Sequence, residues 1–456
     1  MLKLEWIALS TAALSSCGGG DGAGVPQVAE GALQATESVA HAPAAQTAAG
    51  APTTPTLQEG PVTVANSTRA GDQALRGVGA TADGGYVLVW LSDAGPLMMQ
   101  AYNDKGTKTG AETAIVIDVS ARAPDAAAQA IQQASAAVLD DGSVVVLYRV
   151  SRDVDAGTGQ TRSATGAYVQ HVDRHGMSLG AAQQVDVIAD LGGKSPFLGR
   201  PSVLALTSDG GFVVAWTVTH YSSIFSSLST LYLRWFDKNA RPVGAPAQVG
   251  DFPELAFSLQ PDERGGFALT IVRTDNFYRR EAEVEAWSAA HSFVEIVPPT
   301  LRSIVLMPLA GGYVLFEGDS TGASGQLLNA QGTATMAATP LPSLPAAATE
   351  LADGTYLTLR RAGNGAFAVE WFASDMSAIG TPAMLDSRGV LPQLATLSEP
   401  EIVSAWTGQS AKTGTDIYTQ RFDAIATTIR KACLASARQQ HLTGEVRKAF
   451  MTACDR

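Results

Sequence analysis

A short apolar run preceded by a glycine-containing turn recurs along the chain. The copies "ADGGYVLVW" (from Ala82) and "SDGGFVVAW" (from Ser208) are almost identical. Asp-Gly and Gly-Gly allow the positive φ angles of a tight hairpin turn, and the Tyr, Phe, Val and Trp residues that follow favour a buried strand. Each copy therefore predicts a turn and a strand. Seven copies, of which the fourth, fifth and seventh are degraded, begin at Ala82, Asp140, Ser208, Glu263, Leu309, Ala352 and Ser398.

A second segment, with alternating apolar and polar residues, follows each copy. One example is "YLRWFDKNA" (from Tyr232), and most examples end at Asp, Asn or Gly, which predicts another strand and turn. A further short strand leads out of each unit, as in "PAQVGD" (from Pro246), and one more precedes each glycine turn. From Asp83 to Glu399 the copies recur on average every ~53 residues, a period typical of stacked supersecondary units. Four antiparallel strands in each of seven repeats predict an all-β fold, a seven-bladed β-propeller over residues 59–426.

The unit also resembles a bacterial repeat of the form V-N-x-x-T-x-x-x-Q … D-G-G-F-V-V-x-W, found in envelope and secreted proteins. The resemblance is best at Val64–Trp90 and extends over most of residues 61–423. That family carries no agreed activity, so the resemblance implies a repeat architecture and no reaction.

The seventh copy lacks a fourth strand, because helix-like sequence follows "DIYTQRFD" (Asp416–Asp423). A strand-like segment, "PVTVAN" (Pro61–Asn66), precedes the first copy. We expect this segment to complete the last blade, since closure of the ring removes the exposed sheet edges that promote aggregation. The alternative is that it belongs to the N-terminal tether.

The first residues are typical of an export signal rather than of a fold. Lys3 is followed by a short apolar stretch, Trp6–Ser16, and the sequence Leu14-Ser15-Ser16-Cys17 resembles a bacterial lipobox. The resemblance implies that residues 1–16 are a lipoprotein signal peptide and that Cys17 is acylated; an ordinary secretory signal is the alternative. Gly18, in place of Asp, implies an outer-membrane anchor, with the protein facing the periplasm or the cell surface. Residues 17–58 are rich in Gly, Ala, Pro and Thr, and this composition predicts a disordered tether.

The last part of the chain, residues 427–456, is rich in helix formers and is interrupted at Thr443-Gly444. It resembles the PsiF repeat through Cys433, the sequence from Leu442 to Glu445, and "RKAFMTAC", which ends at Cys454. This resemblance predicts a short helical hairpin, and the family's biochemical role is obscure. With Cys17 acylated, Cys433 and Cys454 remain, and we expect them to form a disulfide across the two helices in an oxidising periplasm.

The net charge and the sequence motifs limit which functions we expect. The net charge of -12 argues against a nucleic-acid partner, and the sequence has no apolar run long enough to span a bilayer. His171 and His175 have a spacing seen in metal sites, but they fall on a strand and on the turn beyond it, without a third ligand. No nucleophile motif and no aligned carboxylate pair occur. We therefore predict no catalytic, metal-binding or cofactor-binding residues, and no enzyme activity.

Long connections are predicted at one end of the ring, opposite the glycine turns. They are Ser151–Gly166, Thr217–Thr230, Thr274–Glu281 and the link Asp190–Pro201. Loops on a rigid ring often carry binding residues, and aromatic residues and Arg are enriched in interface hot spots. The predicted partner-binding residues are His220, Tyr221, Phe225, Phe277, Tyr278 and Arg279. We expect a lipid-anchored envelope protein that binds or scaffolds an unknown protein or glycan, with the membrane contacted through the lipid. A glycan-cleaving enzyme and a surface adhesin are the alternatives.

Overall fold

The structure is a computed structural model, and the chain divides into two units, Met1–Ala44 and Ala45–Arg456. Every described residue belongs to the second unit. The described residues are 56–67, 71–93, 96–117, 131–139, 141–155, 161–185, 197–198, 202–205, 210–223, 226–252, 255–262, 266–274, 280–288, 292–309, 311–319, 321–351, 355–362, 366–385, 390–397, 401–410, 414–425, 436 and 450.

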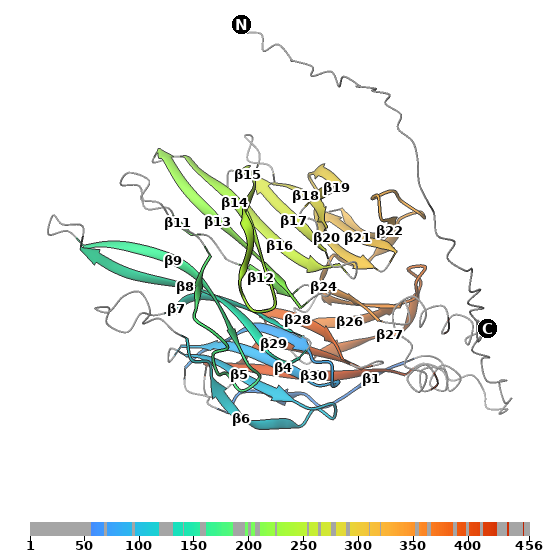
Figure 1. Ribbon diagram of the computed structural model, residues 1–456. Coiled ribbons are helices and arrows are strands. Elements are labelled where there is room, and N and C mark those ends of the chain that lie inside the picture. Colours follow the sequence, from blue (N-terminus) through green and yellow to red (C-terminus); the bar gives the residue numbers. More distant parts are fainter. Residues whose placement is uncertain are drawn as a thin grey trace, which may run out of the picture. The chain divides into compact units, whose positions relative to one another are not determined.

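The described strands form seven antiparallel sheets, so the prediction of an all-β, seven-bladed β-propeller is confirmed (Figure 1). Blade 1 contains β3 (Gln73–Ala80), β4 (Tyr86–Ser92), β5 (Leu97–Tyr102) and β6 (Lys108–Ala114). Blade 2 contains β7 (Ile131–Val138), β8 (Val144–Asp155), β9 (Thr161–Val172) and β10 (Gln183–Gln184). Blade 3 contains β11 (Phe197–Leu198), β12 (Ser202–Ala205), β13 (Phe212–Ser223), β14 (Ser226–Phe236) and β15 (Pro242–Phe252).

The remaining four blades follow the same order along the chain. Blade 4 contains β16 (Leu255–Pro261), β17 (Phe267–Thr274), β18 (Arg280–Trp287) and β19 (Phe293–Thr300). Blade 5 contains β20 (Ser303–Leu309), β21 (Gly312–Asp319), β22 (Gly322–Asn329) and β23 (Thr339–Leu341). Blade 6 contains β24 (Pro345–Glu350), β25 (Tyr356–Arg361), β26 (Phe367–Phe372) and β27 (Ala378–Leu385). Blade 7 contains β28 (Val390–Thr396), β29 (Glu401–Ser410) and β30 (Gly414–Ile425), completed by β1 (Thr56–Glu59) and β2 (Thr63–Val64).

The first strands of the blades surround the centre of the ring. β3 contacts β7, β7 contacts β12, and the series continues through β16, β20, β24 and β28 back to β3. Small residues allow this close approach. A Cβ atom added to Gly77 in β3 would lie 2.5 Å from the carbonyl oxygen of Ala136 in β7. The ring is therefore closed around tightly packed innermost strands.

The sequence repeat has a direct structural meaning, because each copy supplies the turn between the first and second strands of a blade and the second strand itself. The first aromatic residue of the copy stacks on an aromatic residue of the third strand in several blades, as in Tyr86–Tyr102, whose ring centroids are 4.4 Å apart. The Trp at the end of the copy stacks on a Tyr in the same way, as in Trp406–Tyr418 at 6.0 Å. Such pairs stabilise the sheet beyond the apolar area that they bury.

The core is divided among the interfaces between blades. The described buried residues form seven apolar clusters, and each cluster joins two neighbouring blades. The cluster between blades 3 and 4, for example, includes Leu233, Trp235, Phe267 and Trp287. A single blade therefore has both faces covered only when its neighbours are present, which is the physical reason for the ring.

The N-terminal strands complete the last blade, as the sequence predicted. β1 pairs antiparallel with β30 from Thr56↔Ile425 to Glu59↔Phe422, and β2 pairs with the same strand at Thr63↔Thr419 and Val64↔Tyr418. The first three residues of β1 belong to residues 17–58, the segment that we expected to be a disordered tether, so that expectation is wrong for residues 56–58. The backbone of β30 offers hydrogen-bonding groups to this polar segment, and pairing with them orders residues that composition alone assigned to the tether.

Both ends of the sequence carry predictions that lie outside the described residues. Cys17 and the tether up to residue 55 are among them, as are Cys433 and Cys454. Within residues 426–456 only Ser436 and Phe450 are described, and both are helical. The lipid anchor, the helical hairpin and the disulfide therefore stay predictions. Within the described part of the chain, no helix has the length and apolarity needed to cross a membrane.

Candidate functional site

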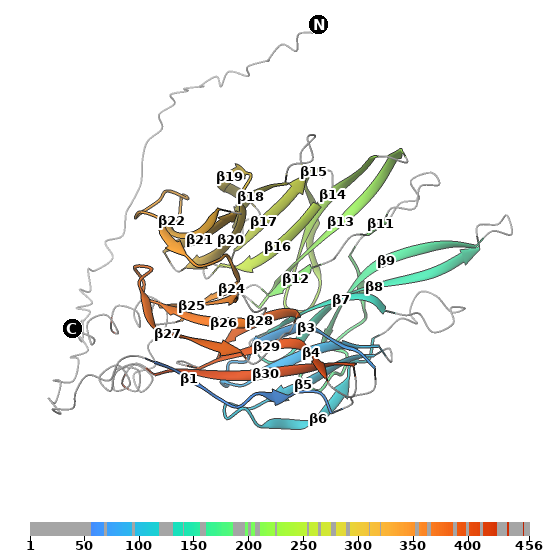
Figure 2. The ribbon, with the colours of Figure 1, turned by 180° about the vertical axis from the view of Figure 1, so that it is seen from behind.

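The two ends of the ring differ in their connections. The turns between first and second strands, and between third and fourth strands, lie at one end; the second-to-third connections and the links between blades lie at the other, which we call the loop-rich face. At this end the second and third strands of blade 2 continue well beyond β7, and those of blade 3 continue for a few residues past their pairs with β11 and β15 at Thr219 and Ser229 (Figures 1 and 2). These two extended hairpins are the main feature of the loop-rich face.

The extended hairpin of blade 3 corrects one expectation. Residues 217–230, which we expected to form a loop, are mostly strand: β13 runs to Ser223 and β14 starts at Ser226. The pairing continues from the blade out to Tyr221↔Ser227, with a register shift before Ser223. The reason is that Thr, Val and Tyr in this segment favour an extended backbone, and each added pair satisfies polar backbone groups.

The extended hairpin of blade 2 shows the same correction. Residues 151–166 were expected to form a loop, but β8 and β9 pair continuously from Val144↔Val172 to Asp155↔Thr161. β7 pairs with β8 only as far as Ile131↔Val150. Among the described strands, the outer part of this hairpin is therefore a two-stranded ribbon.

Two of the six predicted partner-binding residues lie in the described part of the chain. His220 and Tyr221 belong to β13 and pair with Leu228 and Ser227 across the hairpin. The other four, Phe225, Phe277, Tyr278 and Arg279, lie outside the described residues. The structure thus places two predicted residues in an extended hairpin, and their role in binding stays a prediction.

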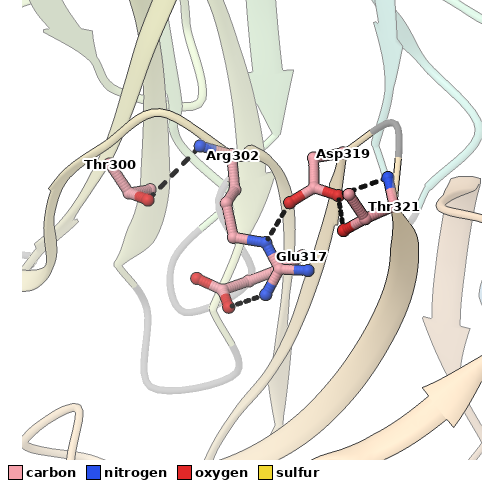
Figure 3. Close-up of polar contacts among 5 residues, drawn as sticks. All are labelled: Thr300, Arg302, Glu317, Asp319 and Thr321. Atoms are coloured by element: carbon pink, nitrogen blue, oxygen red, sulfur yellow. Dashed lines mark hydrogen bonds and ion pairs between the residues drawn. The ribbon is translucent and has the colours of Figure 1, made fainter.

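Arg302, which directly precedes β20 of blade 5, binds two carboxylates at the loop-rich face (Figure 3). The Arg302 guanidinium donates to Glu317 Oε2 and to Asp319 Oδ2, each at 3.2 Å. Thr321 donates through its hydroxyl and its backbone N–H to Asp319 Oδ1, the backbone bond being 2.7 Å long. These bonds from Thr321, with a smaller contribution from Arg302, lower the pKa of Asp319. The arrangement fixes the turn between β21 and β22.

Blade 4 has a second arginine with two carboxylates. Arg273 in β17 lies 3.6 Å from Glu281 and 3.2 Å from Glu283, both in β18. Its guanidinium also lies over the ring of Phe252 in blade 3, 5.4 Å from the centroid. Burial raises the pKa of Glu283; Arg273 opposes that shift, and the neighbouring acids Glu295 and Glu281 add to it. This contact joins blade 4 to blade 3.

Neither of these two arginine–carboxylate clusters was predicted from the sequence. The acidic residues of β18 occupy alternate positions in "EAEVEAW", and this alternation was a usable signal for one charged face of a strand. Arg273 lies in β17 and Arg302 directly precedes β20, so each arginine meets its carboxylates only through the pairing of neighbouring strands.

The described residues also show the contacts of His171. Its Nε2 atom lies 2.8 Å from Ser143 Oγ, and Ser143 Oγ donates to Asp141 at 2.5 Å. Burial lowers the pKa of His171, and Asp141 opposes that shift. Because the serine hydroxyl donates to Asp141, the imidazole does not take its proton, unlike the base in a nucleophile–base pair. Among the described residues, no three His, Cys, Asp or Glu side chains gather as a metal site would require.

Comparison with known families matches a short C-terminal segment. Residues 431–454 match the model of the psiF repeat. This match supports the resemblance seen at Cys433 and Cys454, and it covers too little of the chain to assign the propeller to a family. Among curated proteins, none matches this sequence.

Several solved structures have a similar chain path. A protein of unknown function from Dyadobacter fermentans DSM 18053 has 10% sequence identity and a TM-score of 0.44, covering 81% of this chain and 99% of its own. The polysaccharide lyase Uly1 has 9% identity and a TM-score of 0.44, covering 79% of this chain and 91% of its own. Prolyl oligopeptidase B from Galerina marginata has 9% identity and a TM-score of 0.46, covering 79% of this chain and 51% of its own. At these values the likeness carries no argument about function.

Proposed function

We propose that this protein is a lipid-anchored binding or scaffolding protein of the bacterial cell envelope, and that its loop-rich face holds a protein or glycan partner. The observation that carries the proposal is the pair of extended hairpins in blades 2 and 3. A propeller is a rigid ring, and elements that project from one end of a rigid scaffold are well placed to bind a partner. Aromatic residues and histidine on such a hairpin suit an interface.

We also propose that this protein is not an enzyme. Support comes from the loop-rich face, where the carboxylates nearest the arginines are engaged in ion pairs: Glu281 and Glu283 with Arg273, and Glu317 with Arg302. Asp319, which also bonds Arg302, has its pKa lowered mainly by the hydrogen bonds from Thr321, so it favours its charged form and is a poor general acid. Turnover of any member of a cell-envelope glycan panel would contradict this part of the proposal.

A shortened hairpin tests the binding face. Residues 220–228 are replaced by Asn-Gly, which keeps the pair Thr219↔Ser229 and removes His220, Tyr221 and Phe225. The full-length and shortened proteins each carry a tag, are crosslinked in living cells and are purified. The molecules crosslinked to each protein are then identified and compared. We expect a partner that the intact protein captures and the shortened one loses. Lys238→Ala, in a turn at the opposite end of the ring, is the matched control and should capture normally. Equal capture by the shortened protein would reject this face.

A separate experiment tests the anchor. The Cys17→Ser variant should lose incorporation of labelled palmitate and should leave the membrane fraction, because each buried methylene of an acyl chain contributes about 0.8 kcal/mol of membrane affinity. Labelling that persists in this variant would reject Cys17 as the anchor and would leave the binding face untouched.

A further inference from the structure

Two aromatic and two acidic side chains share one face at the outer edge of blade 4. In the β18–β19 ladder Trp287 pairs with Phe293, and Glu285 pairs with Glu295. Residues two apart on a strand point to the same face of the sheet, so the four side chains lie together. We call these four residues the aromatic–acidic patch. The patch lies beside the turn between the third and fourth strands, at the end of the ring opposite the loop-rich face.

The aromatic half of the patch is packed against blade 3. Trp287 is only 6% exposed, and its ring packs against Trp235 of blade 3 at 5.8 Å between centroids. Phe293 stacks on Trp287 at 4.9 Å with an interplanar angle of 28°, and yet Phe293 is 54% exposed. A scattered exposed apolar residue is ordinary. Here the exposed ring is held in place by a buried aromatic pair, which gives it a defined orientation.

The acidic half of the patch carries an unbalanced charge. Glu285 and Glu295 face each other across the two strands, and like charges in this position destabilise a sheet. Burial raises the pKa of Glu285; a hydrogen bond of 2.9 Å from Trp287 Nε1 opposes that shift, and Glu283 and Glu295 add to it. Arg273 lies further along the blade with Glu281 and Glu283. Among the described residues, no cationic side chain pairs with Glu285 or Glu295.

We propose that the aromatic–acidic patch binds an arginine or lysine side chain from an extended segment of a partner protein. A cation over the face of an aromatic ring is attracted by the ring's electrons, and a guanidinium donates strong hydrogen bonds to carboxylates. Such a cation would neutralise the repulsion between Glu285 and Glu295. The aliphatic part of the side chain has apolar surface nearby, since Val243 of blade 3 pairs with Trp235 and is 43% exposed.

The patch is distinct from the loop-rich face and does not depend on the proposed function. It lies at the opposite end of the blade, so both surfaces can be occupied at once. Arginine suits the patch better than lysine, because its planar group can stack on a ring while it bonds a carboxylate.

Titration with a synthetic peptide tests this inference on the full-length protein. The probe is an acetylated hexapeptide of alternating arginine and glycine, and the matched probe has neutral citrulline in place of arginine. Binding is measured by calorimetry and by tryptophan fluorescence. We expect the arginine peptide to bind and the citrulline peptide to bind at least tenfold more weakly. Equal affinity for the two peptides would overturn the proposal.

Variants locate the binding to the patch. The double variant Glu285→Gln, Glu295→Gln keeps an oxygen acceptor for Trp287 Nε1, so the fold is retained while the charge is removed. It should bind the arginine peptide about tenfold more weakly, and Phe293→Ala several-fold more weakly. Val294→Ala is the control, since Val294 is on the same strand, faces the other side and is 58% exposed. Unchanged affinity in the double variant, or an equal loss in Val294→Ala, would reject the patch.

Discussion

The hydrogen bonds of Asn66 give the sharpest test of ring closure. This residue follows β2 and is 2% exposed. Its side-chain N–H donates to Asp416 Oδ1 at 2.8 Å, and its side-chain oxygen accepts a bond from the Ile417 backbone N–H at 2.8 Å. Asp416 is itself 1% exposed. The change Asn66→Ala removes both bonds and leaves the N-terminal strands held to blade 7 mainly by backbone pairing.

The expected loss follows from the two bonds. A hydrogen bond to a charged acceptor contributes about 1.5–3 kcal/mol, and a neutral one contributes about 1 kcal/mol. Their removal from a buried position should therefore lower the free energy of unfolding by about 3 kcal/mol. Domains are usually stable by only about 5–15 kcal/mol, so a loss of this size is easily measured.

The measurement is equilibrium unfolding in urea, followed by tryptophan fluorescence. Trp90 and Trp406 are buried on the two sides of the closure, in blades 1 and 7, and both report on it. Asn329→Ala is the control: Asn329 also accepts two backbone bonds, from Gln331 and Thr333, but within one half-buried turn of one blade. We expect a loss of about 1 kcal/mol there, less than the sum for two buried neutral bonds, because water can replace these bonds at a half-buried turn. If Asn66→Ala costs no more than Asn329→Ala, closure does not depend on this contact.

Two further predictions concern packing and pH. Gly77→Ala should lower the free energy of unfolding by about 2–3 kcal/mol, because the new Cβ would lie 2.5 Å from the carbonyl oxygen of Ala136; thermal unfolding measures this. Gly180→Ala, with no atom near the new Cβ, is the control, and similar losses in both variants would refute the packing argument. Burial lowers the pKa of His171 in the folded state, so the unfolded state binds the proton more readily below about pH 6.5, and stability should fall as the pH drops from about 7 to 5. His171→Gln should flatten unfolding profiles in this range; an unaltered profile would show that another group causes the dependence.

The seven-bladed fold could be predicted because its signals are local. Each blade repeats a glycine turn, a β-branched strand and a second strand, and the ring follows because each face needs a neighbour. The segment before the first repeat was assignable to blade 7 because its alternating Val residues are strand-like. These features depend on residues that are close together in the sequence.

The candidate surfaces were less predictable. The outer parts of β13 and β14 are rich in Ser and Thr, so their composition is that of a loop although their backbones pair. The aromatic–acidic patch depends on the register of β18 and β19, which brings Glu285 opposite Glu295. A one-residue shift would place different side chains together, and the sequence does not specify that register.

Closure by the N-terminal strands also affects how the protein is made. A chain synthesised or exported from its N-terminus exposes β1 and β2 long before β30 exists, since Asn66 and Asp416 are 350 residues apart. During that interval blade 1 has no seventh blade to cover Leu75 and Trp90, so assembly needs a late, long-range step of the kind that slows folding. Once the ring is complete, force applied to either end of the described chain acts first on the same few pairs between β1, β2 and β30. The two chain ends therefore share one mechanical weak point.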